Sequence, residues 1–183
     1  MKMKMVESDK WATEKQDRKR RWKQFQEDNK EVLMNFAHTN GFDNGEEPFI
    51  LAEAFSRTLI EKATRQVYGE KGKQQHLRCH YDTEVADKKI EGKFRLNDSD
   101  QYPTDDISLS KEEYLEMEDS CIIVFAHWDG VVRAYDLKGK HKEDEWHKPR
   151  YTTKDSEKVT ETRLQYDPKD AIWTTTITLP PEL

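Results

Sequence analysis

The sequence of 183 residues has little cysteine and no long apolar run. Its two cysteines, Cys79 and Cys121, are too few for a disulfide scaffold and form no CxxC pair, so we expect free thiols. No apolar stretch approaches the roughly 18 residues of a membrane span, and no signal-peptide core is present. Nothing therefore indicates export or insertion, and we expect a cytoplasmic protein that does not bind a membrane.

Hydrophobic residues are also scarce, at 34% of the chain against 37% charged residues. A chain of this length can still bury the core of one medium domain, so a single domain is expected. The net charge of −6 argues against a nucleic-acid partner on average. Residues 1–25, however, hold nine Lys or Arg against four Asp or Glu, a net charge of +5 that leaves −11 for the rest. Such a basic arm can be steered to phosphate, or it can simply be a solvated helix face.

Residues 8–40 are predicted to form one long helix. Its apolar residues fall at spacings that make a single stripe, and Asn40-Gly41 is a stop signal. At 1.5 Å per residue it would extend roughly 45 Å, longer than its own domain needs. We therefore separate a basic N-terminal helix, residues 1–41, from a core domain, residues 42–183, and expect the outer end of the helix to contact DNA or another chain.

The core domain shows alternating helix and strand signals. A second helix is predicted over 48–68, and its row of Glu53, Arg57, Glu61 and Arg65 is interpreted as surface ion pairs. The apolar run 121–126 predicts a central strand that turns at Asp129-Gly130. The remaining predictions are a hairpin over 76–96, a polar loop over 97–110, a short helix over 111–118, a strand over 131–137, an exposed loop over 138–158, and strands over 159–166 and 172–179.

The hairpin carries the most specific chemistry. Strand alternation places Asp82 and Glu84 on one face of its first strand, and Glu91 and Lys93 on the same face of its second. A turn at Asp87-Lys88 would set Glu84 opposite Glu91 and Asp82 opposite Lys93. Opposed glutamates repel each other in an ordinary hairpin. A divalent cation bound between them makes their proximity favourable, because such ions prefer carboxylate oxygens as ligands. The pattern predicts a Mg²⁺ site beside a lysine that orients or deprotonates an attacking water.

Asp82, followed after nine positions by Glu91-Gly92-Lys93, resembles the PD-(D/E)xK signature of restriction-endonuclease-like nucleases. The resemblance covers roughly residues 46–137, with a helix before the hairpin and a helix and strand after it. Tyr81 stands where the motif has proline, and Gly92 stands where an apolar residue is more usual. The resemblance implies an α+β (α/β) fold, in which a central mixed β-sheet is flanked by helices and a restriction-endonuclease-like core follows the long N-terminal helix.

The same resemblance implies a metal-dependent deoxyribonuclease. Asp82 and Glu91 would bind Mg²⁺, for which Mn²⁺ can substitute, and Lys93 would be catalytic; Glu53 would be a further ligand, with Glu46 and Glu47 behind it. The hairpin register adds Glu84 to the ligand set. Cutting both strands of double-stranded DNA needs two sites, so a homodimer is expected. DNA contacts are expected from Lys19, Arg20, Arg21, Lys23, Arg78, His80 and Arg95.

Other interpretations stay open at this stage. The charged hairpin face can be the solvated edge of a sheet, where charges prevent aggregation. Residues 138–150 combine basic groups with Trp146, which suits either a DNA-contacting loop or a solvated connection. The alternative function is a non-catalytic interaction protein, phage-encoded or accessory, whose acidic body binds a basic partner.

Overall fold

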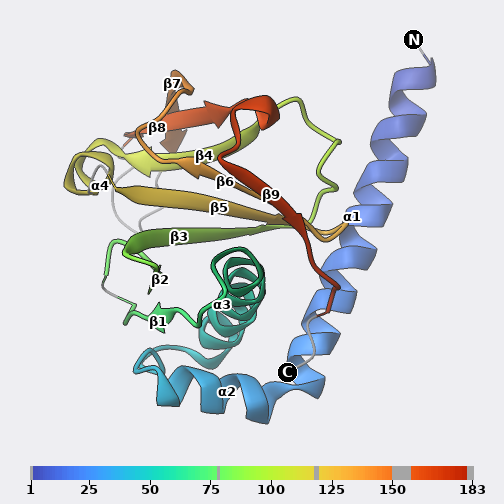
Figure 1. Cartoon of the computed structure of the whole chain (residues 1–183). Helices are drawn as coiled ribbons and strands as arrows, with labels where there is room; N and C mark the ends of the chain where they lie inside the picture. The colour runs from blue at the N-terminus through green and yellow to red at the C-terminus, as the bar shows by residue number, and fades with distance from the viewer. Residues whose placement is uncertain (1, 78, 118–119, 150–157, 181–183) are drawn as a thin grey trace.

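The computed structural model describes residues 2–77, 79–117, 120–149 and 158–180. A six-stranded sheet in the order β1-β2-β3-β5-β6-β9 forms the centre, with α3 on one face and the three-stranded sheet β4-β8-β7 on the other (Figure 1). This confirms a mixed α+β architecture with a central mixed sheet flanked by helices. The helices are α1 (Lys2–Asp28), α2 (Lys30–Thr39), α3 (Glu47–Tyr68) and α4 (Lys111–Glu116), and the strands are β1 (Lys73–Gln74), β2 (Thr83–Val85), β3 (Lys88–Arg95), β4 (Asp105–Ser110), β5 (Cys121–His127), β6 (Val131–Asp136), β7 (Lys142–Pro149), β8 (Lys158–Tyr166) and β9 (Trp173–Thr176).

Strand β5 is the centre of the core and lies parallel to β3, whereas β6 runs antiparallel to it. A parallel pair needs a crossover connection, which β4 and α4 supply over the face opposite α3. Every residue of β5 is buried, as expected for a strand covered on both faces. Ile122 and Val124 pack in the cluster beneath α3, and Ile123 and Phe125 pack in the cluster beneath the three-stranded sheet.

The N-terminal segment is two helices, so the prediction of one helix over 8–40 is wrong. The chain leaves helical geometry at Asn29, with φ −112° and ψ 17°, where the side-chain amide donates to the Phe25 carbonyl at 2.9 Å. Asparagine commonly competes with helix hydrogen bonds in this way. After the break α2 runs beneath α3, while the first turns of α1 extend past the body (Figure 1).

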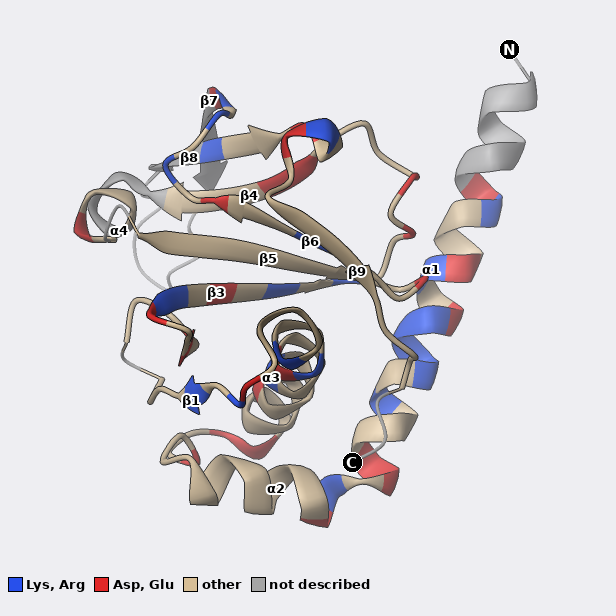
Figure 2. Cartoon of the chain, viewed as in Figure 1, with Lys and Arg blue, Asp and Glu red and all other residues tan. Residues whose placement is uncertain are grey.

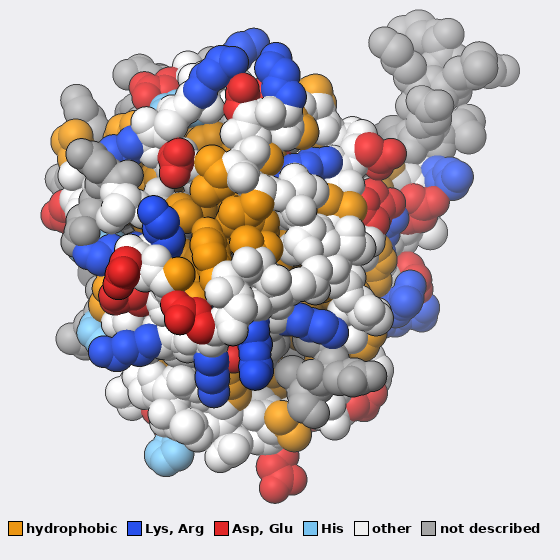
Figure 3. All heavy atoms as spheres, viewed as in Figure 1, with side chains coloured by type: hydrophobic (Ala, Val, Ile, Leu, Met, Phe, Trp, Pro, Cys, Tyr) orange, Lys and Arg blue, Asp and Glu red, His pale blue; other side chains and the backbone are white. Residues whose placement is uncertain are grey.

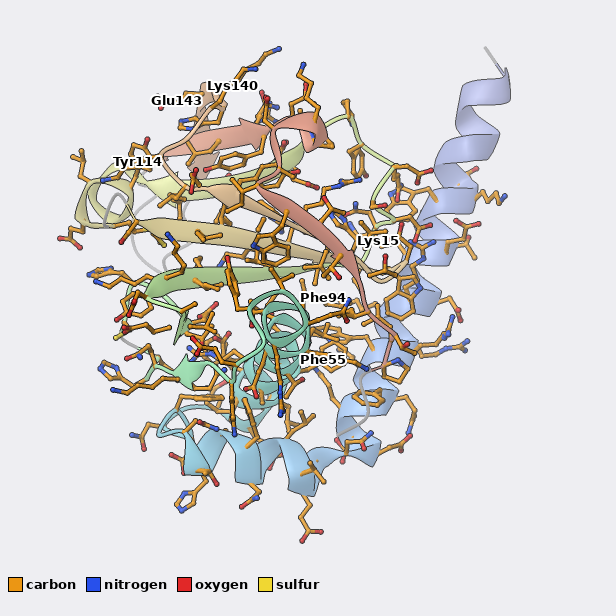
Figure 4. All side chains as sticks on the ribbon, viewed as in Figure 1. Lys15, Phe55, Phe94, Tyr114, Lys140 and Glu143 are labelled. Carbon is orange, nitrogen blue, oxygen red and sulfur yellow. The ribbon has the colours of Figure 1, made fainter. Side chains whose placement is uncertain are left out.

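An aromatic cluster anchors the inner half of α1. Trp22 and Phe25 pack on Phe55 of α3, with ring centroids 6.3 and 5.4 Å apart. Phe55 in turn contacts Phe94 of β3 at 5.3 Å, and Figure 4 shows the two rings together between helix and strand. The position of α1 is therefore fixed by packing against both α3 and the sheet.

Two segments predicted to be loops are strands. Residues 105–110 form β4 and residues 142–149 form β7, and both pair with β8. Ile107 and Leu109 of β4 alternate with polar residues and enter the second cluster, a short pattern that the surrounding polar sequence obscures. Strand pairing thus overrides the high polarity of both segments. The predictions over 48–68, 111–118, 121–126, 131–137, 159–166 and 172–179 are confirmed, with shifted ends.

The charged residues mix both signs on the surface. Figure 2 shows basic and acidic residues interspersed along α1, so its net positive charge is not a continuous stripe. On the face in Figure 3, charged side chains surround a central area of apolar ones. None of the described helices is both long and apolar enough to cross a membrane.

Gly92 sits where α3 comes close to β3, because a Cβ there would lie 2.6 Å from Cγ1 of Ile60. We predict that Gly92→Ala lowers the free energy of unfolding by about 1–3 kcal/mol, the usual cost of overpacking, measured by urea denaturation. In an Ile60→Ala background the same change should cost less, because the clashing atom is gone. Strictly additive losses would contradict this explanation of the glycine.

Candidate functional site

The hairpin register differs from the one predicted. Its turn is the two-residue Ala86-Asp87, with φ of 49° and 59°, a left-handed conformation that matches the twist of paired strands. Thr83 therefore lies opposite Ile90, and Glu84 lies opposite Lys89 instead of Glu91. The first strand is also short, since β2 spans only Thr83–Val85 and the preceding residues up to Asp82 are irregular.

Asp82 occupies the edge of β3 where β2 ends. Its backbone N–H donates to the Ile90 carbonyl at 2.8 Å, and its carboxylate Oδ2 accepts the Gly92 N–H, also at 2.8 Å. Gly92 pairs with Val124 of β5 on one side, and on the other side, where the β2 pairing has ended at Ile90, the Asp82 side chain takes the place of a strand partner. This local geometry holds Asp82 beside Glu91-Gly92-Lys93 even though the predicted register is wrong.

Helix α3 contributes Glu53 and Arg57 to the same place. Arg57 is only 3% exposed; its Nε donates to Glu53 Oε1 at 2.7 Å and its Nη2 lies 3.2 Å from Asp82 Oδ1. Nη1 donates to the carbonyls of Gln75 and Asp82, and the guanidinium stacks over the Phe42 ring. The interpretation of Arg57 as part of a surface ladder is therefore wrong: it is a buried bridge between helix and hairpin.

Glu91 and Lys93 project from the face of β3 opposite α3. Their side chains form an ion pair, with Lys93 Nζ 2.5 Å from Glu91 Oε1. Burial alone would lower the pKa of Lys93, but the carboxylates of Glu91, Asp82 and Glu53 outweigh it and raise that pKa. Lys93 is therefore an ammonium at neutral pH, suited to stabilising an anion and not to removing a proton from water.

The carboxylates leave the site with excess negative charge. Burial, followed by the nearby Glu91 and Glu53, raises the pKa of Asp82 to about 7, although Arg57 and the Gly92 N–H oppose the shift. A cation beside such a carboxyl group stabilises its ionised form. Hard carboxylate oxygens are also the donors that Mg²⁺ and Mn²⁺ accept, so the residues fit a divalent ion chemically.

The arrangement is not a preformed cage. Across the described part of the chain, no group of three or more His, Cys, Asp or Glu side chains is already close enough to hold a metal ion. Glu53 and Asp82 instead lie on either side of Arg57, while Glu91 pairs with Lys93. Asp82 and Glu91 are the residues that would hold an ion at the strand edge.

Other residues predicted for the site lie elsewhere. Glu84 faces Lys89 and does not join the cluster, Glu47 pairs with Lys30 at 2.6 Å, and Glu46 precedes α3 as its N-cap. His80 lies 3.3 Å from Glu116. Arg78 falls outside the described residues. Of the basic residues on α1, Arg21 stacks over Trp128, Arg20 pairs with Asp17, and Lys19, Arg20 and Lys23 line a shallow hollow along the helix.

A second group of buried polar residues was missed from the sequence. Asp105 of β4 accepts the Tyr135 hydroxyl at 2.6 Å and lies 2.9 Å from His127 Nε2 and 3.2 Å from Arg133 Nη1. These residues come from three strands, and Asp105 falls in a segment predicted to be a loop. Sequence spacing gives no signal for such a cluster.

A cavity of about 690 Å³ opens between β3 and the three-stranded sheet, next to this group. Its lining begins at Lys93, continues through Arg95 and Asn97 along the same chain segment, and includes Tyr102 and Arg163. Among the predicted DNA-contacting residues that the structure describes, Arg95 is the one that lines this cavity together with Lys93. The cavity and the carboxylate cluster therefore share the lysine.

Comparison with known proteins adds no assignment. No family model matches the chain, and no curated protein or solved structure matches it either. The functional interpretation therefore rests on the residues and geometry of this chain.

The pH dependence of stability tests the role of Asp105 in the buried polar group. Burial would raise the pKa of Asp105, but the His127 ring beside it, the hydrogen bond from the Tyr135 hydroxyl and the charge of Arg133 outweigh this effect and lower that pKa. The stabilisation it provides is therefore present above its ordinary pKa, near 4, and is lost as pH falls through the lower folded value. We predict that Asp105→Asn destabilises the protein by about 1.5–3 kcal/mol near pH 7, and that the difference shrinks below about pH 4.

The measurement is urea denaturation of both proteins across this pH range. Asp9→Asn, at an exposed position on α1, is the matched control and should leave stability nearly unchanged. A destabilisation by Asp105→Asn that stays constant from neutral to acid pH would show that the charge of Asp105 is not what stabilises the fold.

Proposed function

We propose that this protein is a Mg²⁺-dependent endonuclease that hydrolyses phosphodiester bonds in DNA, with Mn²⁺ able to substitute. The observation that carries the proposal is that Asp82, held by the Gly92 N–H at the edge of β3, lies near enough to the Glu91–Lys93 ion pair for these charges to shift one another's pKa. The order of elements supports it as well: α3 precedes the hairpin, and α4 and β5 follow. A restriction-endonuclease-like core is part of this proposal.

Each residue of the cluster has a separate role in the proposed reaction. Asp82 and Glu91 would present carboxylate oxygens to the ion, and Arg57 holds Asp82 and Glu53 in place from α3. An ion held there would supply a Lewis acid, which lowers the pKa of a water molecule and offsets charge on the phosphate. Lys93 donates from its ammonium to the phosphate oxygens, whose negative charge grows in the transition state.

The proposal extends to the form of the enzyme and its substrate. One site per chain cuts one strand, so cleavage of double-stranded DNA requires a homodimer. Lys19, Arg20 and Lys23 lie together on one part of α1 and supply basic groups for contact with the DNA backbone. Because the rest of the chain carries a net negative charge, we expect the DNA contacts to be confined to this part of α1 and to weaken as the salt concentration rises.

The first prediction concerns cleavage. Wild-type protein should nick or linearise plasmid DNA with Mg²⁺ or Mn²⁺, followed by gel electrophoresis. Lys93→Met should slow cleavage by about 10²–10⁴-fold, because one group that stabilises transition-state charge is removed. Asp82→Asn should have a similar effect through loss of a metal ligand.

Glu84→Gln is the matched control, because it removes a carboxylate from the same hairpin outside the cluster. It should cleave at nearly the wild-type rate. Circular dichroism of each variant checks that the fold is kept. Folded Asp82→Asn and Lys93→Met proteins that cleave normally would refute the proposed function.

The second prediction concerns metal binding without DNA. Mn²⁺ should raise the melting temperature, because an ion that binds only the folded state adds stability, about 2.7 kcal/mol at a hundredfold excess over Kd. Glu91→Ala should lose most of this rise, and Glu84→Gln should keep it. A protein that only binds a partner through its charged surface would show no rise, and that result would favour the interaction-protein alternative.

A further inference from the structure

The cavity beside Lys93 has the size and lining of a ligand site. Its volume of about 690 Å³ lies within the range of small-molecule pockets, about 300–1,000 Å³. It is bounded by β3 on one side and by β4 and β8 on the other, with the segment from Asn97 to Thr104 contributing to its wall. A space of this volume is large enough for one nucleotide.

Its polar groups suit a nucleotide. Arg95 stacks over the Phe125 ring at 5.5 Å and donates to the Asp106 carbonyl at 2.5 Å, so its guanidinium is held in the wall. Arg163 enters from β8, with Nη1 4.0 Å from Asp106 Oδ2. Together with Lys93, these residues place three cationic side chains around one cavity, and such side chains are the usual donors to phosphate oxygens.

The acidic residues of the lining are largely neutralised from within the protein. Asp105 is bound by Tyr135, Arg133 and His127. Asp106 accepts the Thr104 hydroxyl at 2.7 Å and lies near Arg163. Asp105 is therefore balanced by groups other than the three cations of the lining, whereas Asp106 shares the charge of Arg163.

Tyr102 provides an aromatic surface. Its side chain lines the cavity yet is 49% exposed, so it is not needed to fill the core. An exposed tyrosine of this kind can stack on a base, whatever the base is. Asn97 also lines the cavity, where its amide nitrogen donates to the Asp98 carbonyl at 2.8 Å and lies 3.3 Å from His127 Nδ1.

We propose that this cavity takes one unpaired nucleotide of the DNA strand, next to the phosphate that Lys93 contacts. This inference rests on the proposed function and specifies its substrate: DNA with a mismatch, a gap or a single-stranded end is preferred to a fully paired duplex. An unpaired base enters at little cost, whereas a paired base must first leave its stack. The preference is then a property of the cavity, separate from the metal site.

The test is fluorescence anisotropy with a short labelled duplex and with the same duplex carrying one central mismatch. Binding is measured in EDTA, which prevents cleavage, and at one fixed salt concentration. Wild-type protein should bind the mismatched duplex about 5-fold tighter or more, since stacking of a base is worth about 1 kcal/mol or more and 1.4 kcal/mol is tenfold. Tyr102→Ala should remove this preference, and Tyr102→Phe should retain it.

Phe49→Ala is the matched control, because Phe49 is an aromatic residue with similar exposure, 55%, at the start of α3 and outside the cavity lining. It should keep the wild-type preference. Equal binding of both duplexes by wild-type protein, or a preference that survives Tyr102→Ala, would overturn the inference. A free mononucleotide that binds as tightly as the mismatched duplex would also overturn it, because the cavity would then take the free ligand.

Cleavage of the same two duplexes with Mg²⁺ separates this inference from the proposed function. Cleavage without a binding preference contradicts only the nucleotide cavity. A binding preference without any cleavage contradicts the nuclease proposal and leaves a nucleic-acid-binding site.

Discussion

The candidate site depends on one buried cation, the guanidinium of Arg57. It joins Glu53 on its own helix, the carboxylate of Asp82 and two backbone carbonyls of the segment leading into the hairpin. A buried charge is costly unless it is paired and hydrogen-bonded, and here the donors of Arg57 are shared among several acceptors. Without this bridge, Glu53 and Asp82 would repel each other, and α3 would lose its polar link to the hairpin.

Packing around this bridge explains the geometry of the strand edge. Gly92 has no side chain, so α3 approaches β3 closely through Ile60, and its N–H remains available to Asp82. The price of this arrangement is a carboxyl group that is difficult to ionise, as the raised pKa of Asp82 shows. Local electrostatic strain of this kind is common where a site is selected for binding or chemistry instead of stability.

The sequence predicts the parts of the fold with strong local signals. Helix α3 has regular apolar spacing and a terminal glycine, and β5 is an uninterrupted apolar run, so the sequence predicts both elements correctly. The sequence also predicts Asp82 beside the Glu91-Gly92-Lys93 segment, where the structure has its carboxylate on the Gly92 N–H, although the predicted register is wrong; the roles of these residues stay a prediction. The turn at Ala86-Asp87 was missed because it lacks the glycine that usually marks such turns.

The remaining features could not be predicted from local sequence patterns, because they arise from contacts between residues that are far apart in the chain. Strands β4 and β7 exist through pairing with β8, and the cavity beside Lys93 exists only once β4 has folded over the sheet. Arg57 has the spacing of a surface ion pair, and only the packing of α3 on the hairpin buries it.

The most direct test of the account is a crystal structure with Mn²⁺, in which anomalous scattering locates the ion. The account predicts one ion at the edge of β3, with oxygens of both Asp82 and Glu91 within about 2.0–2.3 Å, typical distances for divalent ions in oxygen sites. Ordered Mn²⁺ elsewhere on the protein, with these two carboxylates still held by Arg57 and Lys93 alone, would contradict it.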